Sequence, residues 1–232
     1  MKKTYLIIFL VSSIISATSQ TKPLSLLLKT GINISHYDLP KQYSPNDRII
    51  DKGSIENFQI AVLTDLSLEK HLIIETGLIF NGKGGKTEIS KPVVLWENST
   101  SKPIYLEVPV NLIYSQDLVR NFKIFVGGGP YVSLGIGGKN KYSGNDGDII
   151  SHPYSGNKII TYGKDNQNYE GTYNRLTPID FGLNTTAGIQ YKKLQLYFNY
   201  GFGMQDVKPK DSHENMGKNR TLTFGVGYFL HK

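Results

Sequence analysis

The sequence contains no cysteine in its 232 residues. Disulfide bonds, thiolate-bound metal sites and a lipid-modified cysteine are therefore excluded, and the chain is not a lipoprotein of the usual kind. Long apolar runs are also scarce, because after Ile15 no stretch offers the roughly 20 uninterrupted apolar residues that a transmembrane helix needs. We therefore expect no transmembrane helix in the mature chain.

Common catalytic and metal-binding patterns are missing as well. None of the five histidines has the i, i+4 spacing of a helical metal pair, and no G-x-S-x-G sequence marks a nucleophilic serine. Ser35 and His36 are adjacent, but nothing supplies a third catalytic partner. Gly85-Lys86-Thr87 resembles the end of a phosphate-binding loop, yet Phe80 occupies the place of its first glycine, so we expect a solvated loop. The sequence thus predicts a protein that is not an enzyme and binds no cofactor or metal.

The charge balance is mildly basic. The formal net charge is +7, and removing Lys2 and Lys3 with a leader subtracts two and leaves +5. This modest excess suits contact with anionic lipid headgroups, including lipopolysaccharide. No dense stripe of lysine and arginine indicates a nucleic-acid partner.

Residues 1–19 have the three-part pattern of a secretory signal peptide. Lys2 and Lys3 precede a short apolar run, Tyr5 to Ile15, and the small residues Ala17-Thr18-Ser19 follow it. The apolar run is too short to span a membrane well. We expect cleavage before Gln20, which leaves residues 20–232 as one exported domain.

The segment from Ile104 to Tyr114 carries the clearest pattern in the mature chain. Alternate residues are apolar, and the set between them is mixed and mostly polar. Side chains alternate across a strand, so the segment predicts a strand with one continuous apolar face. Its length of about eleven residues is what a tilted strand needs to cross the hydrocarbon layer. The apolar set is Ile104, Leu106, Val108, Val110, Leu112 and Tyr114.

Seven further segments repeat this alternation, which gives eight predicted strands. The connections between them alternate between long and short. This pattern is typical of an all-β, eight-stranded antiparallel up-and-down transmembrane β-barrel, with short periplasmic turns and long extracellular loops. The predicted strands are approximately 24–37, 55–68, 71–83, 104–114, 122–136, 178–191, 194–205 and 221–230.

The composition of the two faces indicates which one meets lipid. A soluble carrier barrel of the lipocalin type would alternate too, but with a charged outer face and an apolar pocket. Here the polar face consists mostly of glycine, asparagine, serine, threonine and glutamine, with few charges. That face suits a cramped interior, and the face rich in leucine, isoleucine, valine and phenylalanine suits lipid. The sequence therefore favours an integral protein of the outer membrane of a Gram-negative cell.

Four segments resemble the PorT-like outer-membrane β-barrel family. They are Gly77-Leu-Ile-Phe80, Gly82-Lys-Gly-Gly-Lys86, Tyr105-Leu-Glu-Val-Pro109 and Phe125-Val-Gly-Gly-Gly-Pro-Tyr131. The similarity spans nearly the whole mature chain and implies an eight-stranded barrel with an outer-membrane address. One branch of that family takes part in protein secretion across the outer membrane, but no motif here assigns the chain to it.

Several charged and amide side chains fall on the predicted inward face. An unpaired charge inside a narrow barrel is costly, so we expect these side chains to pair or to hold water. Small barrels are filled by side chains rather than open. We interpret the set as a structural polar network; a ligand site or a catalytic carboxylate pair is the alternative. The predicted network comprises Lys29, Asp65, Glu75, Glu107, Asn111 and Asp180.

The segment 137–177 is the longest predicted irregular region, with five tyrosines among glycine and asparagine. Such loops are often functional, and aromatic anchors among adaptable polar residues suit surface recognition. We expect a structural or interaction role in the cell envelope, with an envelope protein as the partner bound through this loop. The final strand, with Tyr228, Phe229 and Leu230, resembles the signal that outer-membrane assembly machinery reads. The alternatives are a small hydrolase of lipid or peptide, a secretion-associated barrel of the PorT type and a narrow channel.

Overall fold

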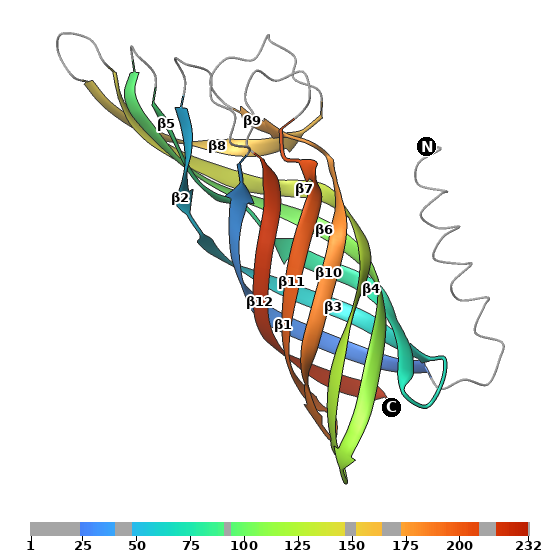
Figure 1. Cartoon of the computed structure of the whole chain (residues 1–232). Helices are drawn as coiled ribbons and strands as arrows, with labels where there is room; N and C mark the ends of the chain where they lie inside the picture. The colour runs from blue at the N-terminus through green and yellow to red at the C-terminus, as the bar shows by residue number, and fades with distance from the viewer. Residues whose placement is uncertain are drawn as a thin grey trace, which may run out of the picture.

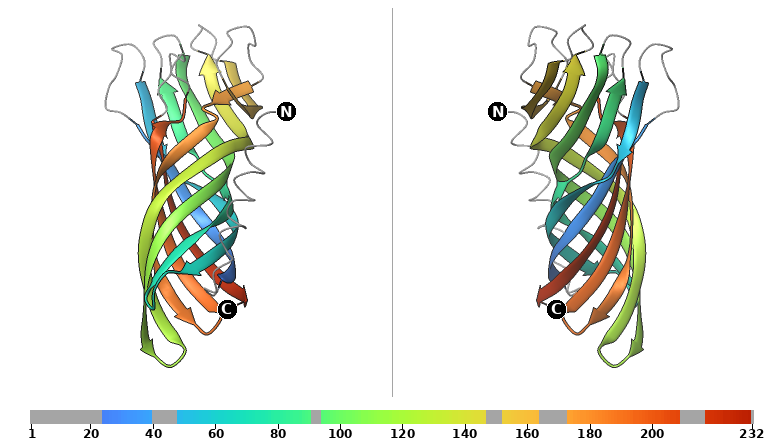
Figure 2. Two further views of the ribbon diagram at one scale, coloured as in Figure 1. Left: turned by 90° about the vertical axis from the view of Figure 1, so that its right-hand side faces the viewer. Right: turned by 90° about the vertical axis from the view of Figure 1, so that its left-hand side faces the viewer.

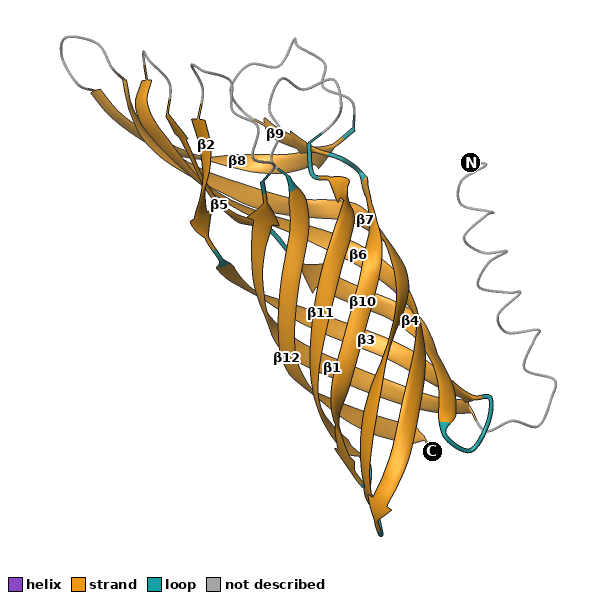
Figure 3. Ribbon diagram, viewed as in Figure 1, coloured by secondary structure: helices purple, strands orange, loops and turns teal. Residues whose placement is uncertain are grey.

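The computed structural model describes most of the chain beyond the predicted signal peptide, which lies outside the described residues. The described ranges are 24–39, 48–90, 94–146, 152–163, 173–208 and 217–231. Strands and short turns make up these ranges (Figure 3). Among them, no helix has the length and apolar character that crossing a membrane would require.

The described residues form twelve strands. In chain order they are β1 Leu24–Asp38, β2 Arg48–Gly53, β3 Ile55–Ser67, β4 Leu72–Gly82, β5 Gly85–Ser90, β6 Val94–Val119, β7 Phe122–Asp146, β8 His152–Tyr162, β9 Tyr173–Leu176, β10 Ile179–Tyr191, β11 Leu194–Asp206 and β12 Lys218–His231. β1, β3, β4, β6, β7, β10, β11 and β12 pair in that order as antiparallel neighbours, and β12 pairs back onto β1. The ring forms a tall barrel whose strands are strongly tilted relative to the barrel axis (Figures 1 and 2). The predicted eight-stranded up-and-down barrel is confirmed.

The pairing of the first and last ring strands closes the barrel. β1 and β12 run antiparallel from Leu27 opposite Phe229 to Asp38 opposite Lys218. Every ring strand therefore has a partner on both sides. Closure matters because an open strand edge in lipid would leave backbone N–H and C=O groups without hydrogen bonds.

The two faces of the ring strands lie as the alternation predicted. Leu106, Phe198 and Phe224 are 36%, 41% and 52% exposed on the outer face, whereas Asn111 is 4% exposed inside. The rings of Phe198 and Phe224 lie 6.2 Å apart on that outer surface. The apolar stripes therefore form the outer wall and the polar stripes line the interior.

The predicted loops were partly wrong, because several of them are strands. β6 and β7 continue well past the barrel, and β5 and β8 pair with their outer halves. β2 pairs with β5, and the short β9 pairs with β8 in parallel. The sequences of these segments mix polar and apolar residues without a regular period of two, so the apolar alternation that marks a barrel strand is missing from them. Gly85-Lys86-Thr87 accordingly begins a strand and not a solvated loop.

The connections at the opposite end are tight. The turn between β6 and β7 consists of Arg120 and Asn121 alone, so the predicted turn from Ser115 was too long. Asn121, in this turn, has a φ angle of 66°, and Lys192, in the turn between β10 and β11, has a φ angle of 54°. Asparagine adopts this left-handed region readily, and it allows a strand to reverse within two residues.

A run of three glycines in β7 allows its neighbours to approach closely. A Cβ atom at Gly129 would lie 1.9 Å from the carbonyl oxygen of Val110 in β6. A Cβ atom at Gly127 would lie 2.2 Å from the carbonyl oxygen of Leu112. Both contacts are with backbone, which cannot move without disturbing the β6–β7 ladder. Glycine is therefore required here for close strand packing.

We expect Gly129→Ala to destabilise the barrel by about 1–3 kcal/mol, the usual cost of forcing extra volume into a packed site. The free energy of unfolding in urea, measured with protein in lipid vesicles, would report it. Gly137→Ala is the matched control, because a Cβ atom at Gly137 meets nothing within 4 Å. Equal stabilities of the two variants would contradict the requirement for close packing at Gly129.

Candidate functional site

The barrel interior holds two clusters of buried charge. The first, the Lys29 cluster, consists of Lys29, Glu75 and Asn111. The ammonium of Lys29 lies 2.5 Å from Oε2 of Glu75, and both side chains are at most 5% exposed. The side-chain amide of Asn111 donates to Oε1 of the same carboxylate at 3.3 Å. The ammonium also lies 4.9 Å from the centre of the Tyr197 ring, so an aromatic face covers its other side.

The second, the Lys83 cluster, consists of Lys83, Glu107 and Asp180. The Lys83 ammonium lies 2.9 Å from Oε2 of Glu107 and 2.9 Å from Oδ2 of Asp180. It lies 4.2 Å from the centre of the Tyr131 ring. The amide of Asn219 donates to Oδ2 of Asp180 at 3.2 Å. One cation is thus shared by two carboxylates that come from β6 and β10.

All six side chains of the predicted polar network point into the barrel, and each is at most 8% exposed. Lys29, Glu75 and Asn111 lie together, while Glu107 and Asp180 meet through Lys83. Asp65 lies directly opposite Glu75 in the β3–β4 ladder. The predicted network omitted Lys83, although it shares the inward spacing of Glu75 and Asn81 in the same segment. Lys83 directly follows the last residue of β4. The alternation of side chains places it on the inward face but does not show which carboxylate it pairs with.

Neutral side chains fill the space around the charges. The amide of Asn33 donates to Asn81 at 2.7 Å, and that of Asn81 donates to Glu107 at 3.1 Å. The hydroxyl of Thr223 donates to Asn33 at 2.8 Å. This chain of hydrogen bonds connects β12, β1, β4 and β6 across the interior, so the carboxylate of Glu107 is held from several directions.

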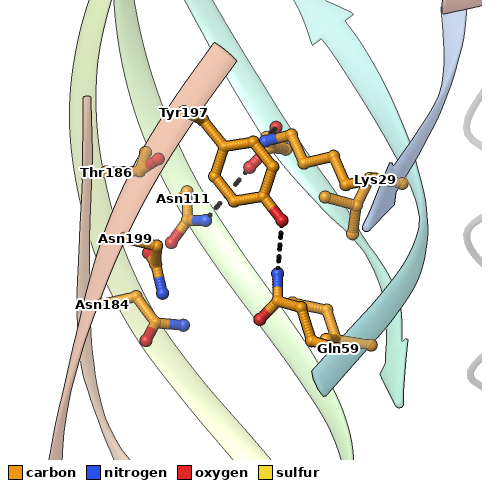
Figure 4. Close-up of a pocket in the computed structure, with 10 residues that line it drawn as sticks. Lys29, Gln59, Asn111, Asn184, Thr186, Tyr197 and Asn199 are labelled. Carbon is orange, nitrogen blue, oxygen red and sulfur yellow. Dashed lines mark hydrogen bonds and ion pairs between the residues drawn. The ribbon is translucent and has the colours of Figure 1, made fainter. Parts of the chain in front are cut away.

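A small cavity of about 20 Å³ lies beside the Lys29 cluster. Figure 4 shows Tyr197 reaching across it, where its hydroxyl accepts a hydrogen bond from the Gln59 amide at 2.9 Å. The volume is enough for about one water molecule and too small for a metabolite. Among the described residues, no three histidine, aspartate or glutamate side chains come together as a metal site. The interior here is a packed polar core.

Apolar side chains cover the end of the barrel where the long connections lie. Tyr37, Ile160, Leu176 and Val207 are at most 2% exposed and pack together; we call them the mouth cluster. They come from β1, β8, β9 and the residues after β11. β8 and β9 lie across this end of the barrel (Figure 1). Part of the segment 137–177 therefore folds over the mouth.

Hydrogen bonds fix this cover to the barrel rim. The hydroxyl of Tyr162 lies 2.9 Å from the carbonyl oxygen of Gly137 and 3.2 Å from that of Ile104. Burial raises the pKa of Tyr162, so its hydroxyl stays protonated as a donor. A Cβ atom at Gly135 would lie 2.0 Å from the Tyr162 ring, which shows how closely the ring rests on β7. The backbone N–H of Thr177 also donates to the carbonyl of Val207 at 2.8 Å.

Comparison with known protein families identifies the family of this barrel. Residues 17–208 match the family described as outer membrane protein beta-barrel domain. The chain belongs to this family. It follows that the short turns face the periplasm and that the mouth cluster lies at the outer surface. The match does not confirm the narrower prediction that the chain is PorT-like.

The chain also matches solved structures of small outer-membrane proteins at low sequence identity. Neisserial surface protein A has 10% sequence identity, with 91% of this chain and 100% of that chain covered and a TM-score of 0.41. OprG from Pseudomonas aeruginosa has 12% identity over 91% and 98% of the two chains, with a TM-score of 0.49. Ail, the attachment invasion locus protein of Yersinia pestis, has 12% identity over 91% and 100%, with a TM-score of 0.35. No curated protein matches the sequence.

This outer-membrane barrel carries a strand-built extension beyond its mouth. We use "the extension" for β2, β5, β8 and the outer halves of β6 and β7 (Figures 1 and 2). On its inner face, the rings of Tyr142 and Tyr154 lie 6.3 Å apart, and the Lys158 ammonium lies 4.7 Å from the Tyr142 ring. The Tyr154 hydroxyl donates to Glu97 at 2.9 Å. Tyrosines that the sequence assigned to a loop thus tie neighbouring strands together.

Proposed function

We propose that this protein is a non-enzymatic interaction protein of the outer membrane, in which the barrel is the anchor and the extension is the recognition surface. One observation carries the proposal: the interior is filled and its mouth is covered, while paired strands continue outward. Transport would need an open interior, which the two charge clusters and the mouth cluster occupy. Recognition needs an ordered exposed surface, which the extension provides.

The outward side of β8 supports this role. Pro153, Ser155, Asn157 and Ile159 are exposed at alternate positions. A mixture of two small polar and two apolar residues on a paired strand suits contact with a protein or glycan surface. We propose an envelope protein as the partner of the segment 137–177. Lipid and lipopolysaccharide around the barrel, and assembly machinery that reads β12, complete the proposed partners.

Two alternatives remain open to experiment. A small outer-membrane hydrolase would need a nucleophile, a base and an orienting group in one place. A secretion-associated barrel of the PorT type is the second alternative, because one branch of the family that the Tyr105–Pro109 and Phe125–Tyr131 segments resemble takes part in secretion, although no motif assigns the chain to that branch. Such a barrel would also act through partners, so it is a specific form of the proposed function.

Site-specific photo-crosslinking in intact cells tests the proposal. A photoreactive amino acid at Asn157, on the exposed side of β8, is expected to capture an envelope protein. The same photoreactive amino acid in place of Arg120, in the exposed periplasmic turn, is the matched control and is expected not to capture that protein. Absence of any specific adduct at Asn157, or the same adduct at both positions, would contradict the proposal.

Purified protein in liposomes tests two of the alternatives, the hydrolase and the narrow channel. We expect no ion conductance above that of empty vesicles and no hydrolysis of lipid acyl chains or peptides. Steady conductance would favour a channel, and catalytic turnover would favour a hydrolase.

A further inference from the structure

Four lysines lie close together on the outward face of the extension. Lys86 is on β5, Lys102 on β6, and Lys139 and Lys141 are on β7, and all four are exposed. We call them the lysine patch. Residue spacing places Lys102 on the same face of β6 as Leu106 and Val108, which belong to the lipid-facing wall.

The strand registers bring these side chains side by side. Lys102 lies directly opposite Lys139 in the β6–β7 ladder. Thr100 lies opposite both Lys141 and Lys86, one on either side. Neighbouring strands are about 4.8 Å apart and alternate residues along a strand about 7 Å apart, so the four side chains share a surface on the order of 10 Å across.

The patch begins where the apolar wall ends. On β6 the outward residues run from Val110 through Leu106 to Ile104 and then reach Lys102. On β7 they run from Val132 through Leu134 and Ile136, with 56%, 46% and 49% exposure, to Lys139. The lysines therefore lie at the level of the headgroups of the outer leaflet. A long lysine side chain there can keep its stem against apolar surface while its ammonium reaches the polar layer.

Protein carboxylates do not balance this charge. None of the four lysines forms an ion pair within the part of the chain that the structure describes. Glu88 is on the same outward face of β5, and Glu56 is exposed on β3, where its carbonyl oxygen accepts a hydrogen bond from Lys102 at 3.2 Å. Four cations thus face two carboxylates. On the opposite flank, by contrast, Arg220 is paired with Asp38 at 2.5 Å.

Like charges directly opposite each other on neighbouring strands are destabilising. Lys102 and Lys139 nevertheless occupy such a pair at the rim of the lipid-facing wall. An anionic group between them would convert this repulsion into attraction. Phosphate suits the role because several ammonium groups can donate to its oxygens at once.

We propose that the lysine patch binds the phosphorylated headgroup of an outer-leaflet lipid, namely the phosphates of lipid A. This proposal rests on the lipopolysaccharide contact proposed above and assigns it to one flank of the barrel. Phosphate oxygens would lie between Lys102 and Lys139, with Lys86 and Lys141 to the side and above. The acyl chains would cover the wall formed by Leu106 and Leu134.

Binding of purified, detergent-solubilised protein to lipid A tests the proposal. The probes are bisphosphorylated lipid A and the same lipid with both phosphates removed, and native mass spectrometry counts the bound lipid. The patch variant carries Lys86→Gln, Lys102→Gln, Lys139→Gln and Lys141→Gln. The control variant removes four exposed charges at the periplasmic end through Lys70→Gln, Arg120→Gln, Lys192→Asn and Lys193→Gln. The heat-modifiable mobility of each folded barrel on gels confirms that both variants fold.

We expect the patch variant to bind bisphosphorylated lipid A about tenfold or more weakly than the unmodified protein, because each lysine near an anionic surface contributes measurably to binding. The control variant should bind as the unmodified protein does, and removing the phosphates should abolish the difference. Unchanged affinity of the patch variant, equal losses in both variants, or equal binding of the two lipids would each overturn the proposal. Photo-crosslinking at Asn157 reports a protein partner and is independent of this outcome.

Discussion

Replacing Lys83 with methionine is expected to destabilise the folded barrel by about 3–5 kcal/mol, the range found when one partner of a buried ion pair is removed. The substitution leaves Glu107 and Asp180 buried in the interior without their shared cation. Both carboxylates would have to take up protons or draw in water, and either change costs stability. The free energy of unfolding in urea, and the temperature at which the heat-modifiable mobility is lost, would both fall.

A compensating variant tests whether charge is the cause. Combining Lys83→Met with Glu107→Gln and Asp180→Asn removes all three charges with little change in shape. We expect this variant to recover most of the lost stability, because a neutral hydrogen-bonded interior has no unpaired ion. A triple variant as unstable as Lys83→Met would point to lost packing against Tyr131 instead. Lys123→Met, which breaks the exposed pair with Asp117, should leave stability unchanged.

The second large effect is expected on the outer wall. Val110 is 49% exposed near the middle of the apolar stretch of β6. Arginine there would meet the hydrocarbon layer, so we expect Val110→Arg to destabilise the barrel in vesicles by about 2–4 kcal/mol.

Leu118→Arg provides the matched control for this substitution. Leu118 is 54% exposed on the same strand, close to the periplasmic turn. Arginine at that depth is expected to cost about 0–1 kcal/mol. The same urea titration measures both variants. Similar costs at the two positions would mean that Val110 does not face hydrocarbon, and the assignment of the outer wall would be wrong.

The ring of strands could be predicted from sequence because each ring strand has one apolar and one polar face. Leu106 and Asn111 differ by an odd number of positions, and this parity alone placed them on opposite sides of the wall. The same parity located Glu107 and Asp180 in the interior. It could not show that Lys83 joins them, because that contact depends on how far each strand is shifted relative to its neighbours in the closed barrel.

The extension and the mouth cluster lay beyond sequence reasoning for different reasons. The strands of the extension meet neither the hydrocarbon layer nor a large core, so Lys141 and Tyr142 belong to a stretch without the alternation of a barrel strand. The mouth cluster joins Tyr37, Ile160, Leu176 and Val207 from four separate segments. No periodicity relates residues so far apart, and their contact exists only after the ring has formed.

This last contact has a consequence for the order of assembly. Tyr37 lies at the outer end of the first ring strand, and Val207 follows the seventh, so we expect the two to meet only after the wall has closed around the interior. We expect the buried lysines and carboxylates to stay hydrated through the open top until then. On this view, formation of the mouth cluster is the last step and the one that excludes water from the interior.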